Sequence, residues 1–444
     1  MKVSVLSVFP DLYTTFLQTS LMRKAQEKGL VQFDVGSFLT YCEPTKEGGL
    51  KERLDAPIFG HGAGMLIKPT VVQRAIEAQE QTHGKAFKIF FSPQGQQLDQ
   101  SLIKTIAQKS QEIGHLMLLP ARYEGMDARV ETHYADLIVS IGDFVLMGGD
   151  LPAMMLLEGV MRYLPGVVGK AESVEHDSFT GPFVDVPHYT EPVTWQGSEV
   201  PAVIRSGNHA AMEQWREQQA VKTTLNYHFD WLRSRNLTPE DVQKTLAQMP
   251  AHYVALAHAD VLVDDGQLGG KRVGTTSVTS LDIHDVARSA ATYGIKNYFL
   301  ITPLKDQQKI VNHFLEFWMT QGPEYNKQRH GAIKQVRLHA DLDEVIATIE
   351  AQEGKKPIII ATSAKVHEHK QTITYHDQGI IWQLDRPVLF LFGTGSGLSD
   401  HALERCDYLL VPLNGFSTFN HLSVRSAVAI ILDRWLGISP KAIR

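Results

Sequence analysis

Short apolar runs alternate along the chain with stretches in which apolar residues recur at helical spacing. Most of these runs are rich in β-branched residues and bounded by glycine or proline, which is typical of buried strands in parallel sheets. We expect strands over residues 3–9, 87–92, 115–119 and 137–140, and again over residues 253–257, 298–301, 357–362, 388–392 and 408–411. The alternation predicts an α/β fold, and it occurs twice.

A different pattern separates the two α/β halves. Residues 208–250 are polar and carry no strand signal, and helices are expected over residues 210–221 and 238–249. Thr238 followed by Pro239 is typical of a helix start with Thr238 as its N-cap. Glycine and proline punctuate residues 163–190, which predicts a long loop of the kind that is usually functional or disordered.

One segment of the chain occurs twice. Residues 136–166 and 407–437 each begin with aspartate and an apolar strand, continue through a glycine-bearing loop, and finish with an apolar helix ending at Gly166 or Gly437. A further strand and a glycine-containing turn precede each copy. Because ligands bind at the carboxyl ends of parallel strands, each pair of loops could form one pocket. The alternative is that any two α/β domains share such units.

The composition and charge of the chain exclude several classes of protein. The net charge is −6, and residues 250–444 hold 20 basic and 20 acidic side chains, so the excess negative charge falls on residues 1–249. A non-specific phosphate binder would be basic overall, so any nucleic acid must be recognised by local patches. Cys42 and Cys406 are too few for a disulfide framework or a thiolate zinc site. No apolar stretch reaches the roughly 20 residues of a membrane span, and we expect a cytoplasmic protein.

Two glycine-rich stretches could approach a ligand. Residues 60–64 (GHGAG) permit close backbone approach, or form a plain turn. Residues 393–397 (GTGSG) follow a predicted strand but lack the spacing of a dinucleotide-binding fingerprint. His367 and His369 are interpreted as flanking a solvated loop rather than binding a metal.

Three polar positions have both a functional and a structural interpretation. Arg162 could act on a substrate, or offset the negative end of its helix. Asp177 could be a catalytic carboxylate or a solvated loop acid. Asn420 could cap the last helix, or with Ser423 and Arg425 place donors against a ligand.

Several longer motifs occur in order in the first half: FSPQG at 91–95, RYEGMD at 122–127, SIGDFVLMGGDLPA at 140–153, EHDSF at 175–179, PHYT at 187–190 and SGNH at 206–209. Over residues 1–247 the chain therefore resembles the bacterial tRNA (guanine-37-N1)-methyltransferases of the knotted SPOUT class. The resemblance implies a deep trefoil knot, S-adenosylmethionine bound in bent form, tRNA as substrate, an obligate homodimer, and no DNA or membrane partner. The family also suggests Mg²⁺, for which no ligand cluster is visible.

The resemblance carries specific residues with it. It implies Asp177, from the partner subunit, as the general base for guanine N1, and Arg162 as the group that stabilises guanine O6. It places the cofactor against Ser92, Pro93, Tyr123, Glu124, Ile141, Gly142, Leu146, Gly148 and Gly149. The chain departs from the family pattern at His61, Ala63 and Ala121, and around residues 38–41.

Residues 250–437 resemble a second SPOUT family of RNA methyltransferases. The resemblance rests on TSLDIHDVAR at 279–288, FGTG at 392–395 and NHLSVRSA at 420–427, with departures at Ser396 and Phe419. It implies a second cofactor pocket lined by Gly393, Gly395, Leu413, Leu422 and Ser423.

The expected architecture is two SPOUT-type α/β domains, each a parallel sheet with helices on both faces and a deep C-terminal trefoil knot. The domains are residues 1–165 and 250–444, and residues 166–249 form the interdomain loop and a small helical, tRNA-binding domain. The first half is expected to methylate N1 of guanine 37, and the second another RNA position. Two alternatives stay open: a non-catalytic second half that binds RNA or cofactor, and a nicotinamide-dependent oxidoreductase.

Overall fold

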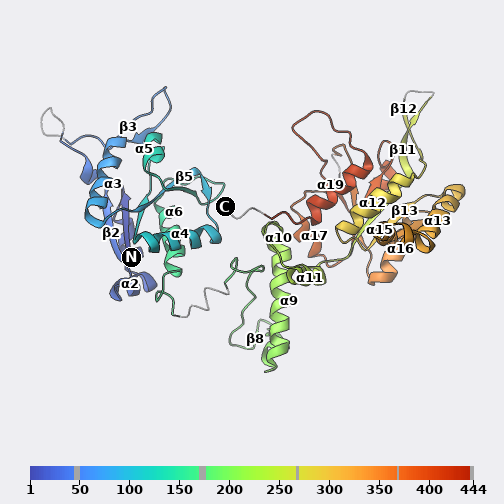
Figure 1. The fold of residues 1–444 in the computed structure, drawn as a ribbon, viewed down its shortest axis with the longest axis horizontal. Coiled ribbons are helices and arrows are strands. Elements are labelled where there is room, and N and C mark those ends of the chain that lie inside the picture. The colour runs from blue at the N-terminus through green and yellow to red at the C-terminus, as the bar shows by residue number, and fades with distance from the viewer. Residues whose placement is uncertain (45–50, 170–176, 267–269, 368–369, 441–444) are drawn as a thin grey trace. The chain divides into compact units, whose positions relative to one another are not determined.

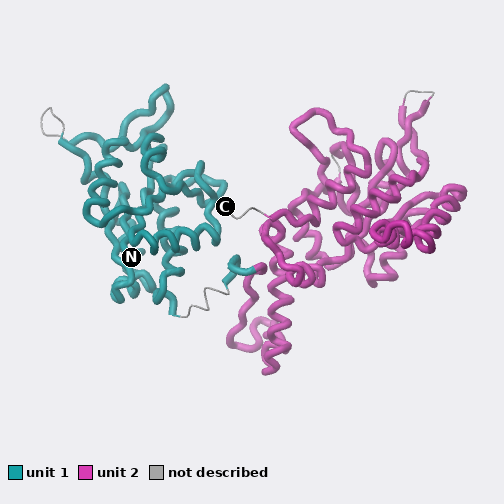
Figure 2. Tube along the Cα trace, viewed as in Figure 1, with its two compact units in different colours: residues 1–181 teal, residues 182–444 magenta. Residues whose placement is uncertain are grey.

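The chain folds into two compact units, residues 1–181 and 182–444 (Figure 1, Figure 2). The computed structural model describes residues 1–44, 51–169, 177–266, 270–367 and 370–440. Within these ranges, no helix is long and apolar enough to cross a bilayer.

The first unit is built on a five-stranded parallel sheet of order β2-β1-β6-β5-β7. The sheet strands are β1 (Lys2–Ser7), β2 (Gln32–Ser37), β5 (Phe87–Gln97), β6 (His115–Leu119) and β7 (Leu137–Ser140). A separate antiparallel hairpin consists of β3 (Asp55–Pro57) and β4 (Met65–Ile67). The four strands expected in this half are present, and the polar edge strand β2 was not foreseen.

Helices cover both faces of this first sheet. Alternate residues of β1 and β6 enter two different cores, one closed by α1, α2, α4 and α6 and the other by α3, α5 and the 3-10 turn η1. These elements are α1 (Leu12–Leu17), α2 (Ser20–Glu27), η1 (Phe38–Tyr41), α3 (Pro69–His83), α4 (Gln100–Ile113), α5 (Ala128–Tyr134) and α6 (Asp150–Arg162). The expected doubly covered parallel sheet is therefore confirmed for this unit.

The second unit contains a seven-stranded parallel sheet of order β14-β13-β10-β17-β15-β18-β16. Its strands are β10 (His252–Ala257), β13 (Asn297–Ile301), β14 (Val336–His339), β15 (Ile358–Thr362), β16 (Thr372–Ile373), β17 (Val388–Gly393) and β18 (Tyr408–Leu410). Two short antiparallel hairpins lie outside it: β8 (Thr194–Trp195) with β9 (Ser198–Glu199), and β11 (Ala259–Asp265) with β12 (Gly270–Thr275).

The helices of the second unit are divided between the two faces of its sheet. One face carries α16 (Leu342–Glu353) and α18 (Asp400–Glu404). The other carries α9 (His209–Tyr227), α10 (Phe229–Arg233), α12 (Ser280–Thr292), α13 (Lys305–Thr320), α15 (Lys327–Ile333), α17 (Gln378–Trp382) and α19 (Val424–Leu436). The remaining helices are α8 (Ala202–Arg205), α11 (Pro239–Gln248) and α14 (Gly322–Tyr325). Thr238 caps α11 as expected, through a capping box with Asp241.

The internal repeat is a repeat of structure. Five strands of each sheet can be compared by renumbering them 1 to 5 in the order in which they occur along the chain. Their spatial order is then 2-1-4-3-5 in both sheets, for β2-β1-β6-β5-β7 and for β13-β10-β17-β15-β18. Asp136 exchanges two hydrogen bonds with the backbone of Lys88, its N–H donating to the carbonyl and its carboxylate accepting from the N–H. Asp407 makes the same two contacts with Ile359. The two units thus share one strand arrangement, down to the aspartate that opens each repeat.

The repeat also corrects one expectation about helix ends. Helices α6 and α19 both have 13 residues. Gly437 is the C-cap of α19, but α6 ends at Arg162 with Tyr163 as its cap, so Gly166 does not stop that helix. Gly166 instead has φ +83° in the turn that follows, a backbone conformation that favours glycine.

Candidate functional site

The first group of predicted cofactor residues lies on three loops at one edge of the first sheet. Ser92 and Pro93 lie in the outer half of β5, where its pairing with β7 becomes irregular. Tyr123 and Glu124 follow β6, and the remaining five residues follow β7: Ile141, Gly142, Leu146, Gly148 and Gly149. Because β6, β5 and β7 are adjacent and parallel, their carboxyl ends meet at this edge.

A buried carboxylate holds these loops in place. Asp150, the first residue of α6, is 1% exposed and accepts hydrogen bonds from Ser7 Oγ at 2.6 Å, Tyr13 OH at 3.1 Å and Arg122 Nε at 2.6 Å. Burial and the Asp150 charge raise the pKa of Tyr13 well above its usual value. Asp150 therefore ties the loop after β6 and the end of β1 to the start of α6.

Close backbone approach explains two glycines of this site. A Cβ on Gly148 would lie 2.5 Å from Arg122 Cδ, and one on Gly149 would lie 2.9 Å from Pro120 Cα. The N–H of Gly149 donates to the Ala121 carbonyl at 2.8 Å, so the loops after β6 and β7 are in direct contact. A larger residue at either glycine would separate them.

Some of the positions that depart from the family pattern adjoin these loops, and residues 38–41 pack elsewhere in the unit. A Cβ on Gly64 would overlap the Glu124 side chain, and Glu124 N–H donates to the Met65 carbonyl, so the stretch at 60–64 adjoins the loop after β6. His61 in that stretch adopts φ +61°. Phe38 is buried in the core, and the backbone carbonyl of Tyr41 accepts a hydrogen bond from Arg74 Nε.

The two predicted catalytic side chains meet within one chain. Arg162, the last residue of α6, forms an ion pair with Asp177, and both side chains are partly exposed. At 1.5 Å of rise per residue, Arg162 lies about 18 Å along α6 from Asp150. The pair is therefore distant from the cofactor loops of its own chain.

An exposed apolar surface borders the first cofactor loops. Its side chains are between 40% and 91% exposed: Phe144, Val145, Leu146, Met147, Leu151 and Met155. Contiguous apolar side chains in water usually mark a surface that another molecule covers.

A cavity of about 1000 Å³ occupies the corresponding edge of the second sheet. All five residues of the second predicted pocket line it: Gly393, Gly395, Leu413, Leu422 and Ser423. The lining also includes residues at the end of β15, after β10 and on the β11–β12 hairpin, among them Thr362, Ser363, His258, Leu262 and Lys271. The loops at the carboxyl ends of β15, β17 and β18 thus enclose one site.

The glycine-rich loop of this cavity is pressed against the hairpin. Gly395 has φ +61°, and a Cβ there would lie 2.7 Å from the carbonyl oxygen of Leu262. Ser396 N–H donates to that carbonyl at 2.8 Å, and Leu262 N–H donates to Gly397 O at 2.8 Å. Only glycine fits this contact without strain.

A chain of hydroxyl groups fixes one histidine in the cavity wall. His258 Nδ1 lies 3.1 Å from Thr276 Oγ1, which lies 2.5 Å from Thr394 Oγ1, and Thr394 Oγ1 donates to the Ala257 carbonyl at 2.9 Å. All three bonds form together only if His258 Nδ1 carries the proton. His258 Nε2 is then an acceptor, and it has no hydrogen-bond partner among the described residues. Burial lowers the pKa of His258, which favours this neutral form.

The last helix begins differently from expectation. Ser423, not Asn420, caps α19, its Oγ accepting from Ser426 N–H. The Asn420 amide instead donates to the Ala364 carbonyl and to Asn414, which ties the loop after β18 to the loop after β15. Asn420 lies too far before the helix to reach its first N–H groups.

Within the described ranges, no group of three or more histidine, cysteine or acidic side chains is placed to hold a metal ion. His367 lines the second cavity and lies 3.0 Å from Ser363 Oγ, whereas His369 lies outside the described residues.

Family comparison accounts for both halves of the chain. Residues 1–234 match the model of tRNA (guanine-1)-methyltransferase TrmD. The chain belongs to this family. Residues 251–437 match a second model, that of S-adenosylmethionine-dependent RNA methyltransferases. The protein is therefore an S-adenosylmethionine-dependent methyltransferase, and the oxidoreductase alternative is wrong.

Relatives of this tRNA methyltransferase family occur with one or both halves. A tRNA (guanine-N(1)-)-methyltransferase of Oleidesulfovibrio alaskensis is 36% identical over 98% of this chain and 99% of its own length. Its counterpart from Nitratidesulfovibrio vulgaris is 34% identical over 98% and 99%. The enzyme of that name from Bacillus subtilis is 38% identical over 54% of this chain and 96% of its own length.

Sequence reasoning missed two groups at these methyltransferase sites. Asp150 lies inside a recognised motif, yet its role depends on Ser7 and Tyr13, which are more than a hundred residues away. His258 directly follows a predicted strand, but Thr276 and Thr394 are brought to it only by the fold. A polar residue directly after a buried parallel strand was the available signal in the second case.

Proposed function

We propose that the first unit methylates N1 of guanine 37 in tRNA. The observation that carries this proposal is the pairing of Arg162 with Asp177, the cation and the base that the reaction needs, at the end of a helix that starts in the cofactor loops. Guanine N1 is a poor nucleophile until its proton leaves. Asp177 takes that proton, and the Arg162 guanidinium offsets the charge that develops on O6.

The loops around Asp150 fit S-adenosylmethionine, which supplies the electrophilic methyl group when bound. Glycines at 148 and 149 bring two loops together, and Tyr123 is 51% exposed at their edge. The nine predicted residues from Ser92 to Gly149 would hold the cofactor there. We infer that the loops form a trefoil knot, as in the SPOUT class. No residue cluster suggests a role for Mg²⁺ at this site in the described ranges.

A homodimer would bring the Arg162–Asp177 pair of one chain to the cofactor loops of the other. The Arg162–Asp177 pair lies about 18 Å from the cofactor loops of its own chain along α6, so one chain alone does not assemble the site. A second copy that covers the exposed apolar surface at Phe144–Met147 would bring its own Asp177 to the cofactor. We place this dimer in the cytoplasm, with its tRNA.

The second unit is proposed to bind S-adenosylmethionine in the cavity at Gly393 and Gly395 and to methylate another RNA position. The cavity volume of about 1000 Å³ and the backbone-only approach at Gly395 suit the cofactor. The second candidate function is a non-catalytic module that binds cofactor or RNA, which the same cavity allows.

Methyl transfer tests the first site. With labelled S-adenosylmethionine and a tRNA transcript bearing guanines 36 and 37, wild type should label guanine 37, as mapped by mass spectrometry. Asp177→Ala should lower kcat about 10²–10⁴-fold, the usual contribution of a general base. Glu112→Ala, at an exposed acid on α4, should leave the rate unchanged. Full activity of Asp177→Ala would refute the assignment.

Calorimetry with S-adenosylhomocysteine tests the second site. The full chain should bind two molecules per protomer, and Ala427→Trp, which fills the second cavity from α19, should reduce the number to one. Binding without labelled RNA would establish the non-catalytic module, and one molecule per protomer in both proteins would remove the second cofactor site.

A further inference from the structure

The boundary between the sequence families differs from the boundary between the folded units. The match to the tRNA methyltransferase family runs to residue 234, whereas the second compact unit begins at Pro182. Helices α8, α9 and α10 therefore belong by sequence to the tRNA enzyme and by packing to the second unit. Residues 182–234, which match the tRNA methyltransferase family, are therefore part of the second folded unit.

The packing is that of a core. Val221, Leu225, Phe229 and Leu232 belong to the same buried cluster as the strands and helices of the second sheet. The Phe229 ring meets Trp382 at 4.7 Å between centroids. In addition, α17 approaches α9 so closely that a Cβ on Gly379 would overlap the carbonyl oxygen of Asn226. We call residues 182–249 the shared segment.

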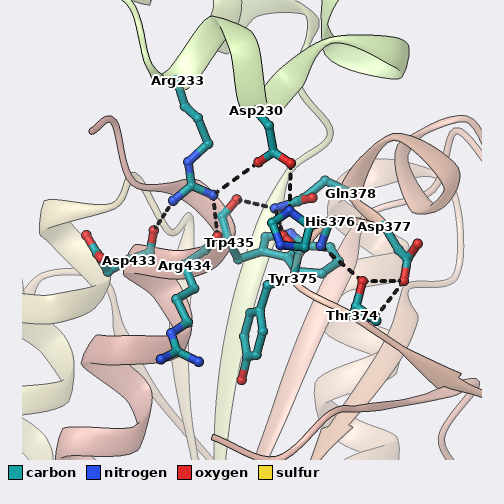
Figure 3. Close-up of polar contacts among 10 residues, drawn as sticks. All are labelled: Asp230, Arg233, Thr374, Tyr375, His376, Asp377, Gln378, Asp433, Arg434 and Trp435. Atoms are coloured by element: carbon teal, nitrogen blue, oxygen red, sulfur yellow. Dashed lines mark hydrogen bonds and ion pairs between the residues drawn. The ribbon is translucent and has the colours of Figure 1, made fainter. Parts of the chain in front are cut away.

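Polar contacts complete this attachment (Figure 3). Arg233 donates to the carbonyls of Arg434 at 2.5 Å and Asp433 at 3.1 Å, at the end of α19. His376 Nδ1 lies 2.6 Å from Asp230 Oδ2. The N–H of Ser439 donates back to the Arg233 carbonyl at 2.7 Å.

The elements that hold the shared segment also form the wall of the second cavity. Helix α19 lines the cavity through Val424, Ala427 and Ile431, and carbonyls of its last turn accept hydrogen bonds from Arg233. Tyr375 lines the cavity, its ring lies 5.3 Å from the Arg434 guanidinium, and its neighbour His376 contacts Asp230. The shared segment is thus fixed directly behind the cavity.

We propose that the RNA methylated at the second cavity is also a tRNA, held for this site by the shared segment. The inference rests on the proposed methyl transfer by the second unit. Exposed cations lie on the shared segment at Lys222 and at Arg216, which also lies 3.9 Å from Glu213, and Lys271 and Lys365 line the cavity. Phosphate contacts of this kind position an RNA while the cavity selects the base. The cavity's volume of about 1000 Å³ leaves room for a nucleobase beside the cofactor.

The test uses the full chain with Asp177→Ala, so that transferred label reports the second cavity alone. Unmodified tRNA transcripts and ribosomal RNA transcripts are offered with labelled S-adenosylmethionine. We expect label in tRNA, and we expect Arg216→Glu with Lys222→Glu to reduce it about tenfold or more, because phosphate contacts dominate affinity. The matched control is Lys305→Glu with Lys309→Glu on α13, which changes charge equally and should have little effect.

Two outcomes would overturn the inference alone: label confined to ribosomal RNA, or tRNA labelling that both double variants reduce equally. The absence of label from every RNA is a different failure. It would contradict the proposed methyl transfer by the second unit, and the inference with it, and S-adenosylhomocysteine binding sensitive to Ala427→Trp would then identify a non-catalytic cofactor site.

Discussion

The carboxylate of Asp150 holds together the segments that form the first site. Three donors from separate segments converge on it, and a buried charge is tolerated only when it is paired in this way. In the second unit, His258 is fixed in a comparable way, because hydrogen bonds through two threonine hydroxyls determine which ring nitrogen carries its proton. Neither residue was assigned a role from the sequence, because their partners are distant along the chain and no local spacing records them.

Replacement of the Asp150 carboxylate should loosen the first site. Asp150→Asn keeps the shape but removes the charge that holds Arg122, and bonds to charged groups contribute about 1.5–3 kcal/mol. We expect KM for S-adenosylmethionine in guanine-37 methylation to rise about tenfold or more. Asp127→Asn, at a carboxylate paired with exposed Arg129, is the control and should change KM little. An unchanged KM in Asp150→Asn would show that the loops hold their shape without it.

At the scale of elements, the sequence predicted the buried strands well and the edges poorly. The strand at 115–119 is observed as β6 with identical bounds, since both its faces are covered and the four residues after His115 are apolar. The edge strand β2 has a buried partner on one side only and reads as polar, so periodicity did not reveal it. The β11–β12 hairpin, which frames the second cavity, carries exposed charges and was missed for the same reason.

The attachment of α10 to α19 should contribute measurably to stability. Arg233→Ala removes two hydrogen bonds to carbonyls, an ion pair with Asp230 and a contact with the Phe229 ring from a side chain that is only 16% exposed, and we expect a loss of about 1.5–3 kcal/mol in the free energy of unfolding. All six tryptophans lie at or after residue 195, so their fluorescence in urea reports the second unit alone. Arg235→Ala, which removes only a stacking contact with Trp231, should cost less. Equal losses would mean that the carbonyl contacts add nothing.

At the scale of the whole molecule, the two families along the sequence do not coincide with the two folded units. Motifs identified both methyltransferases, because contiguous loops carry them. The packing of residues 182–249 onto the second sheet depends on Val221, Leu225, Phe229 and Leu232 meeting strands that follow much later. The sequence of an amphipathic helix indicates that its apolar face is buried, but it does not indicate which sheet that face packs against.

The second unit should lose stability in acid. Nε2 of His252 accepts from the indoles of Trp382 and Trp435, and burial lowers the pKa of His252 from 6.5 to about 4. The unfolded chain therefore binds this proton more readily, and stability is lost as pH falls below 6.5. Between pH 7.5 and 5 we expect a loss of about 2 kcal/mol from this group, measured by tryptophan fluorescence in urea.

His252→Gln is the matched variant, because its amide oxygen accepts from an indole without titrating in this range. Its stability should be lower at pH 7.5 and depend less on pH. A pH dependence as steep as that of wild type would assign the acid sensitivity to other groups.

The burial of α9 and α10 in the second core has a consequence for how such a fused gene can change. A fission of the gene between residues 234 and 251, where the two family matches separate, would leave Trp382 of the downstream product without Phe229, the ring that packs against it. The upstream product would carry an uncovered apolar helix pair. Both fragments would tend to aggregate. Once these helices had packed against the second sheet, selection would therefore act against any later separation of the two halves into different genes.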